Sequence, residues 1–266
     1  MSEAVPVPER APSPWLEARC RAAAVTPARV FLGSAGLSHR TADALALRAD
    51  HALARDAVDT PLDLARVDMA ELGLFAVATE ASDHATHLLR PDLGRRLSAS
   101  ARSTIARGCP AGADVQVVVG DGLSAAAVHA QVPRLLPRLR ALTEARGWTW
   151  GRPFAVRHCR VGVMNDVGDV LHPQVVVLLV GERPGLGTAE SLSAYLALTP
   201  HEGCTDADRN VVANIHDRGT PAAVAAERVL AFADVIRAAG RSGATVREPD
   251  WPDGGGATRH RVASWR

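Results

Sequence analysis

The sequence predicts an α/β fold, in which a helical N-terminal part is followed by a largely parallel sheet with helices on both faces. Three observations predict it. Apolar residues recur at helical spacing through the first seventy residues. The run Val175–Val180 is apolar throughout, as expected for a strand that is buried on both faces of a parallel sheet. Predicted strands then alternate with predicted helices, which is typical of right-handed parallel connections.

The N-terminal part is expected to contain three helices. Residues 1–14 include four prolines and are expected to form a flexible leader, so the helical region is assigned to residues 15–72. Its first two helices are expected at 16–24 and 41–58. Thr60 and Pro61 form a helix start signal, an N-cap hydroxyl followed by proline at the first helical position, so a third helix is expected to end near Gly73.

Residues 73–248 are expected to form the α/β domain, and residues 249–266 a C-terminal tail. Strands are expected at 74–79, 115–119, 154–163 and 175–180. Helices are expected at 91–107, 123–130, on a longer segment that carries Leu135, Leu139 and Leu142, and then at 166–171, 188–197 and 222–239.

Composition and charge exclude several classes of function. All 30 basic residues are arginine, which excludes a lysine Schiff base and a P-loop lysine. A net charge of +1 does not favour nucleic acid, because basic faces supply most of that affinity. The longest apolar run is far shorter than the roughly 20 residues of a membrane span, and the four cysteines contain no C-x-x-C pair. We therefore expect an intracellular protein that binds neither nucleic acid nor membrane.

Two glycine-bearing turns are the candidate ligand sites, because ligands bind beyond the carboxyl ends of parallel strands. Gly181–Gly187 follows the most apolar strand and is expected to open a helix, whose free N–H groups would receive an anion. The pattern allows either a ligand site or a tight packing turn. Asp121, in the turn after the strand at 115–119, is either a helix cap or a ligand contact.

The chain shows no set of acid, base and nucleophile residues, and no metal site is expected. Asp83, His84 and His87 are expected to lie in a solvated polar connector. His158 and Cys159 are neighbours in a predicted strand, so their side chains would face opposite sides and form no dyad.

Several motifs resemble the small (light) chain of ethanolamine ammonia-lyase in their order and spacing. The resemblance covers about Pro27 to Arg247. The motifs that carry it are Pro91–Leu97, Asp121–Ser124, Val180–Gly187, Asp208-Arg209 and Asn214-Ile215-His216.

This resemblance implies a Rossmann-like cobalamin-binding domain in an adenosylcobalamin-dependent carbon–nitrogen lyase. The enzyme would convert ethanolamine, or a related vicinal amino alcohol, to an oxo compound (acetaldehyde from ethanolamine) and ammonia. A large chain, a TIM barrel, would carry the substrate site and the radical chemistry. The small chain would form one wall of the cobalamin cleft at the interface of a hetero-oligomer in the cytoplasm or in a bacterial microcompartment. No catalytic residue is implied in this chain, because the cofactor carries the difficult chemistry.

Three cofactor-binding positions are carried over by the resemblance: Val161, Glu182 and Val211. Val161 follows Arg160, and Glu182 belongs to the Gly-Glu-Arg-Pro-Gly-Leu turn. Val211 stands where the family pattern has a cysteine, and Ser34 stands where it has an arginine. Two other classes of function stay open: a stand-alone nucleotide- or anion-binding module, and a non-catalytic interaction subunit.

Overall fold

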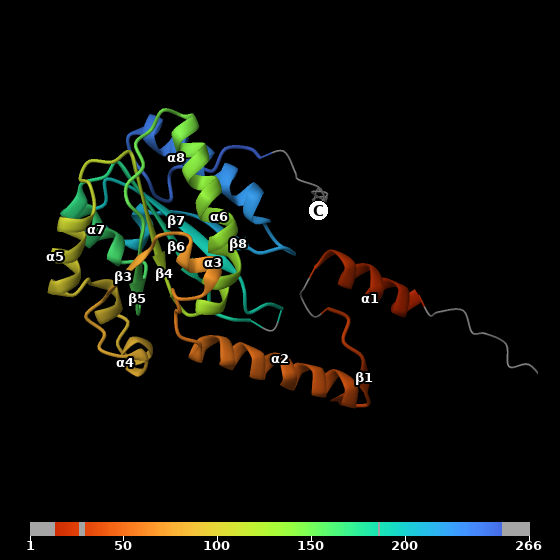
Figure 1. The fold of residues 1–266 in the computed structure, drawn as a ribbon. Coiled ribbons are helices and arrows are strands. Elements are labelled where there is room, and N and C mark those ends of the chain that lie inside the picture. The colour runs from red at the N-terminus through yellow and green to blue at the C-terminus, as the bar shows by residue number, and fades with distance from the viewer. Residues whose placement is uncertain (1–13, 27–29, 186, 252–266) are drawn as a thin grey trace, which may run out of the picture.

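The protein is a mixed six-stranded sheet between two layers of helices, with an N-terminal helical part along one edge (Figure 1). The computed structural model describes residues 14–26, 30–185 and 187–251, so the expected leader before Pro14 and most of the expected tail lie outside the described residues. The strands are ordered β3-β5-β4-β6-β7-β8. Their bounds are β3 Phe75–Ala78, β4 Val115–Gly120, β5 Phe154–Arg157, β6 Val175–Gly181, β7 Leu192–Leu198 and β8 Asn210–Ile215. The first four strands in this order pair in parallel, and the pairs β6–β7 and β7–β8 are antiparallel. This arrangement confirms the predicted fold class.

The helices and the remaining short elements follow the chain in this order: α1 Pro14–Val25, the hairpin β1 Ser34–Ala35 and β2 Ser38–His39, α2 Thr41–Asp59, α3 Val67–Ala70, α4 His84–Leu89, the 3-10 turn η1 Leu93–Arg95, α5 Ala99–Gly108, α6 Ala125–Ala145, α7 Val163–Leu171, the 3-10 turn η2 Asp206–Asp208, and α8 Ala222–Ala239. No helix among the described residues is long and apolar enough to cross a membrane.

The sheet separates two apolar cores. On one face, α6 and α8 pack against alternate strand residues such as Val117, Leu179 and Leu196. On the other face, α5 and α7 cover Val118 and Leu178. Because successive strand residues point to opposite faces, the valine-rich strands β4 and β6 supply both cores.

The prediction of a third helix from Pro61 to near Gly73 is wrong for most of that range, because only the four residues of α3 are helical. The Thr60 hydroxyl donates to the Asp56 carbonyl at 2.7 Å, so it closes α2 and does not cap a new helix. Residues 61–66 form neither helix nor strand: the Asp63 amide donates to His129 Nε2 on α6 at 3.0 Å, and Leu62 is buried in the core. Tertiary contacts with α6 therefore override the local start signal.

Two other predicted helices have different limits. The segment 91–107 is broken into η1 and α5, because residue Leu97 pairs with Thr79 and its amide donates to Asp166 at 2.6 Å. Ser98 then caps α5 by accepting from the Ala101 amide. The two helices expected from 123 onwards are one helix, α6, which contains Pro133 and Pro137.

The predicted strand at 154–163 is too long, because β5 ends at Arg157. The Asp121 carboxylate accepts the amides of His158 and Cys159, each at 2.7 Å, and His158 has a φ of 58°. These two residues therefore lie in a turn, and the expected opposite-facing arrangement in a strand is wrong. The turn leads directly into α7.

The helix expected at 188–197 is a strand, β7, and the sequence analysis did not predict β8. β7 pairs with β6 along its whole length, from Gly181 opposite Leu192 to Val175 opposite Leu198. This pairing satisfies the backbone groups at an edge of β6 that would otherwise be open. The turn after β6 therefore opens no helix.

Candidate functional site

A cavity of about 450 Å³ lies where β4, β5 and β6 end. Parallel strands bring their carboxyl ends to the same edge of the sheet, so turns that are distant in sequence meet there. Its lining residues come from those three turns and from β7 and β8: Gly122, Leu123, Cys159, Arg160, Val161, Val180, Gly181, Glu182, Arg183, Ser193, Tyr195 and Ala213. Two of the three predicted cofactor-binding residues, Val161 and Glu182, thus line one cavity.

Glu182 is the acidic side chain of this cavity and is held in one orientation. The Ser193 hydroxyl donates to Oε1 of Glu182 at 2.6 Å, and the backbone N–H of Asn214 donates to the same oxygen at 2.9 Å. Burial raises the pKa of Glu182, but these hydrogen bonds outweigh burial and hold the pKa below its ordinary value. Glu182 is therefore ionised at neutral pH, and neither of these two bonds uses Oε2.

Val161 lies in the turn between β5 and α7, half-buried against the α5–α7 core. Asp121 anchors this turn through the amides of His158 and Cys159, and the Arg160 amide donates to the Gly94 carbonyl at 2.8 Å. The aspartate is thus neither a helix cap nor a lining residue of the cavity. Ser124 caps α6 in its place, by accepting from the Ala127 amide.

Val211 lies on β8, outside the cavity lining but on the same face of the sheet. It is paired with Tyr195 of β7, which does line the cavity, and residues paired across a ladder point to the same face. Its side chain is 41% exposed. The structure therefore places the third predicted residue beside the cavity rather than in it.

The histidines near this edge support the turns. His87 is buried, and its Nε2 lies 2.9 Å from the Gly122 carbonyl, which can only accept, so this nitrogen carries the proton. Burial lowers the pKa of His87, so the ring is neutral. Asp83 caps α4 by accepting the Thr86 amide at 2.8 Å. The expectation of a solvated polar connector is therefore wrong for His87, which is buried in α4, whereas Asp83 is exposed.

Two glycines of the turns are needed for packing. A Cβ at Gly181 would overlap the Ser124 carbonyl oxygen, and a Cβ at Gly122 would overlap the Gly181 carbonyl oxygen. Gly185 has open space around its Cβ position. The turn after β6 is thus a tight packing turn at Gly181 and also lines the cavity through Glu182.

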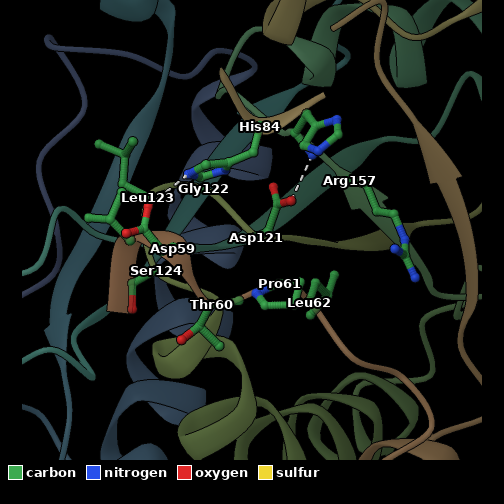
Figure 2. A pocket seen from close by; sticks show the side chains of 13 residues that line it. Asp59, Thr60, Pro61, Leu62, His84, Asp121, Gly122, Leu123, Ser124 and Arg157 are labelled. Atoms are coloured by element: carbon green, nitrogen blue, oxygen red, sulfur yellow. Dashed lines mark hydrogen bonds and ion pairs between the residues drawn. The ribbon is translucent and has the colours of Figure 1, made fainter. Parts of the chain in front are cut away.

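A smaller cavity of about 90 Å³ lies against the same β4–α6 turn and the end of α2. Figure 2 shows Asp121 at the wall of this cavity, together with Asp59 and His84. The Oδ1 atom of Asp59 lies 3.8 Å from the Nε2 atom of His84. The β4–α6 turn therefore separates two cavities of different size.

The sequence analysis missed the contribution of β7 and β8, namely Ser193, Tyr195 and Ala213. The available signal for β7 was the recurrence of apolar residues at every second position, Leu192, Ala194, Leu196 and Leu198. The thiol of Cys159 also reaches the cavity wall, but its burial raises the pKa well above the ordinary value, so it is a protonated packing group. In the part of the chain that the structure describes, no three His, Cys, Asp or Glu side chains gather to hold a metal ion.

The fold and the cavity define an α/β protein with a cavity at the carboxyl edge of its sheet. One fixed carboxylate and the arginines Arg160 and Arg183 line it together with a largely apolar remainder. The family model described as "Ethanolamine ammonia-lyase light chain (EutC)" matches residues 17–247. The chain belongs to this family.

Relatives named ethanolamine ammonia-lyase small subunit are similar over most of the chain. The Clostridium acetobutylicum protein is 37% identical over 84% of this chain and 92% of its own length. The Pseudomonas syringae pv. tomato protein is 41% identical over 82% of this chain and 77% of its own length. The Clostridium perfringens protein is 42% identical over 80% of this chain and 72% of its own length.

Proposed function

We propose that this chain is the small subunit of an adenosylcobalamin-dependent ethanolamine ammonia-lyase, and that it forms one wall of the cobalamin site. A large chain, a TIM barrel, supplies the substrate site, and the complex converts ethanolamine to acetaldehyde and ammonia. The observation that carries this proposal is the meeting of Val161 and Glu182, from two separate turns, in one cavity.

The residues present fit a corrinoid. A corrin ring is broad and apolar on its faces, and its edge carries amide side chains that donate hydrogen bonds. The cavity offers apolar surface at Val161 and Val180, and an ionised carboxylate at Glu182. A corrinoid far exceeds 450 Å³, so this cavity fits one edge of the cofactor, and a second chain has to cover the rest.

Each residue of this chain has a binding role in the proposal. Glu182 accepts from a corrin amide, while Val161 and Val211 give apolar contacts. When bound, adenosylcobalamin supplies a homolytically weak cobalt–carbon bond as the radical source. In this proposal the large chain does the chemistry, and this chain contributes binding groups only.

The first test is co-expression of this chain with a large chain from the same organism. Ammonia release from ethanolamine is measured with each chain, and then the cofactor, omitted in turn. Activity that needs all three components supports the proposal. A folded complex that binds cobalamin but stays inactive favours the non-catalytic interaction subunit, and failure to bind cobalamin overturns the cofactor role.

A Glu182→Ala change tests the site itself. Removing a buried acceptor typically costs about 1–3 kcal/mol, so we expect cobalamin binding to the complex to weaken by that amount. The affinity is measured by spectrophotometric titration, with Glu227→Ala on the exposed face of α8 as the control. An unchanged affinity would remove Glu182 from the cofactor site.

The alternative of a stand-alone anion-binding module loses its structural basis. It required a helix after the Gly181–Gly187 turn, and the structure has the antiparallel strand β7 there. The helix that was expected to supply N–H groups to an anion is therefore not formed by residues 192–198. Thermal-shift measurements with nucleotides, compared with adenosylcobalamin on the complex, separate the two functions.

A further inference from the structure

The end of β8 beside the candidate cofactor cavity contains a β-bulge. Leu192 of β7 pairs with Ile215 of β8. Ala194 of β7 pairs with Val212, so the single residue between them on β7 lies opposite two residues of β8. The second of these two residues is Asn214, whose φ of 60° lies in the left-handed region that few residues other than glycine adopt. Bulges of this kind redirect the groups of a strand, often next to a functional site.

The bulge directs the backbone N–H of Asn214 at Glu182. This N–H donates to Oε1 of Glu182 at 2.9 Å, and Asn214 has no paired residue on β7. Ser193, the β7 residue opposite the bulge, donates its hydroxyl to the same oxygen at 2.6 Å. Because the backbone dihedral angles set the direction of an N–H, the position of the Glu182 carboxylate depends on the conformation of one bulged residue.

The side chain of His216 holds Asn214 in this conformation. Nε2 of His216 lies 2.8 Å from Oδ1 of Asn214, and the backbone N–H of Arg218 donates to Nδ1 of His216 at 3.2 Å. A backbone N–H can only donate, so Nδ1 carries the lone pair, Nε2 carries the proton, and Nε2 donates to Asn214. His216 is buried, and burial lowers its pKa, which favours this neutral ring.

The turn after β8 packs against the same two residues. The Asn214 carbonyl accepts the backbone N–H of Thr220 at 2.8 Å. A Cβ at Gly219 would overlap this carbonyl oxygen and would lie 2.7 Å from Nε2 of His216. The bulge is therefore held on one side by the histidine and on the other by a turn whose close approach requires glycine.

We propose that His216 is a positioning residue for the cofactor: it fixes the bulge at Asn214, and the bulge holds the Glu182 carboxylate ready for a hydrogen-bond donor of the ligand. This inference rests on the proposed function. Neither His216 nor Asn214 lines the cavity, so His216 acts through Glu182 and not by contact with the ligand. The proposal gives a task to the motif Asn214-Ile215-His216, which the three expected cofactor contacts leave without one.

The test uses two substitutions that each keep one half of the hydrogen bonding of His216. The side-chain nitrogen of glutamine reaches the place of Nε2, so His216→Gln keeps the donor to Asn214. The side-chain oxygen of asparagine reaches the place of Nδ1, so His216→Asn keeps the acceptor for Arg218 and loses the donor. His201→Asn, at an exposed histidine in the loop after β7, is the matched control. Urea unfolding of each purified chain verifies that it folds.

Binding of adenosylcobalamin to the complex with the large chain is measured by spectrophotometric titration at neutral pH. We expect His216→Asn to weaken binding about fivefold, the effect of one lost hydrogen bond, with His216→Gln and His201→Asn within about twofold of the unaltered chain. Asn214→Ala removes the acceptor of the same bond at an exposed position and should reproduce the loss, so the test stands even if His216→Asn does not fold.

The Glu182→Ala background separates positioning from a general structural effect. If His216 acts through Glu182, His216→Asn leaves the affinity of the Glu182→Ala complex unchanged, because the two effects are not additive. Equal weakening in both backgrounds, unchanged binding by His216→Asn or Asn214→Ala, or a loss in His216→Gln as large as that in His216→Asn would overturn the positioning role and leave the proposed function standing. If the complex with the unaltered chain does not bind adenosylcobalamin, the proposed function fails instead.

Discussion

At the scale of single residues, the site depends on two carboxylates with different tasks. Glu182 faces the cavity and is fixed by Ser193 and Asn214. Asp121 faces the backbone and fixes the turn that carries Val161. Neither forms a described ion pair with an arginine, and the hydrogen-bond donors orient both groups.

Glu182 is expected to make stability depend on pH on the acid side. Its pKa in the folded chain lies below the ordinary value of 4.5, so its contribution is fully present above that value and is lost as the pH falls through the folded pKa. We expect Glu182→Gln to lower the free energy of unfolding at pH 7 by about 1 kcal/mol. The difference from the unaltered chain should disappear at low pH in urea unfolding, and a difference that persists there would contradict the assignment.

Asp121→Ala should loosen the β5–α7 turn. The change leaves the amides of His158 and Cys159 without their acceptor, which typically costs about 2 kcal/mol in the free energy of unfolding. Asp217→Ala is the control, because it removes an exposed ion pair with Arg134 that contributes little. Thermal and urea unfolding of both variants check the prediction, and equal effects would show that Asp121 does not anchor the turn.

At the scale of elements, the edge of the sheet depends on the close contact of two turns. The β4–α6 turn and the end of β6 approach so closely that glycine is required at Gly122 and Gly181. The Leu123 amide donates to the Gly181 carbonyl at 3.1 Å and joins the turns directly.

Gly181→Ala is expected to separate these turns, because its Cβ would overlap the Ser124 carbonyl oxygen. Overpacking of this kind costs about 1–3 kcal/mol, and the widened turns should also weaken cobalamin binding to the complex. Gly185→Ala, in the same loop, meets open space and should change neither quantity. Both variants are compared by urea unfolding and cobalamin titration. A tolerated Gly181→Ala would show that the two turns do not need this contact.

At the scale of the whole molecule, the exposed large apolar side chains belong to only some of the elements. The helices α5 to α8 expose no large apolar side chain among the described residues, whereas α2, α4 and β8 do. A chain that works inside a larger complex can leave such a surface open, because its partner covers it.

The isolated chain is therefore expected to self-associate more than the complex. Light scattering at increasing concentration should show association of the chain alone. The double variant Leu45→Glu/Leu53→Glu should reduce it by adding charge at two exposed positions of α2. Addition of the large chain should have the same effect by covering exposed apolar surface. Ala141→Glu, on the exposed face of α6, is the control, and equal suppression by this variant would point to net charge alone.

The family and the central strands could be predicted from the sequence because both depend on local information. The apolar run Val175–Val180 indicates a buried strand wherever it lies in the chain, and the ordered motifs from Pro91 to His216 identify the family without any knowledge of contacts. The helix at Ala222–Ala239 was also predicted with its correct bounds, since its core positions recur at helical spacing.

What only the tertiary structure decided is the set of features that depend on hydrogen bonds between distant segments. The helix expected at 188–197 is replaced by β7, because β6 presents an open edge with which this segment pairs. β5 stops at Arg157 because the carboxylate of Asp121, from another turn, accepts the next two backbone amides. The α2 residues Leu45, Ala49, Ala52 and Leu53 could be predicted to share one helical face, but not to be exposed. Periodicity reports which residues share a face, while the identity of the neighbour that covers that face is set by the whole fold.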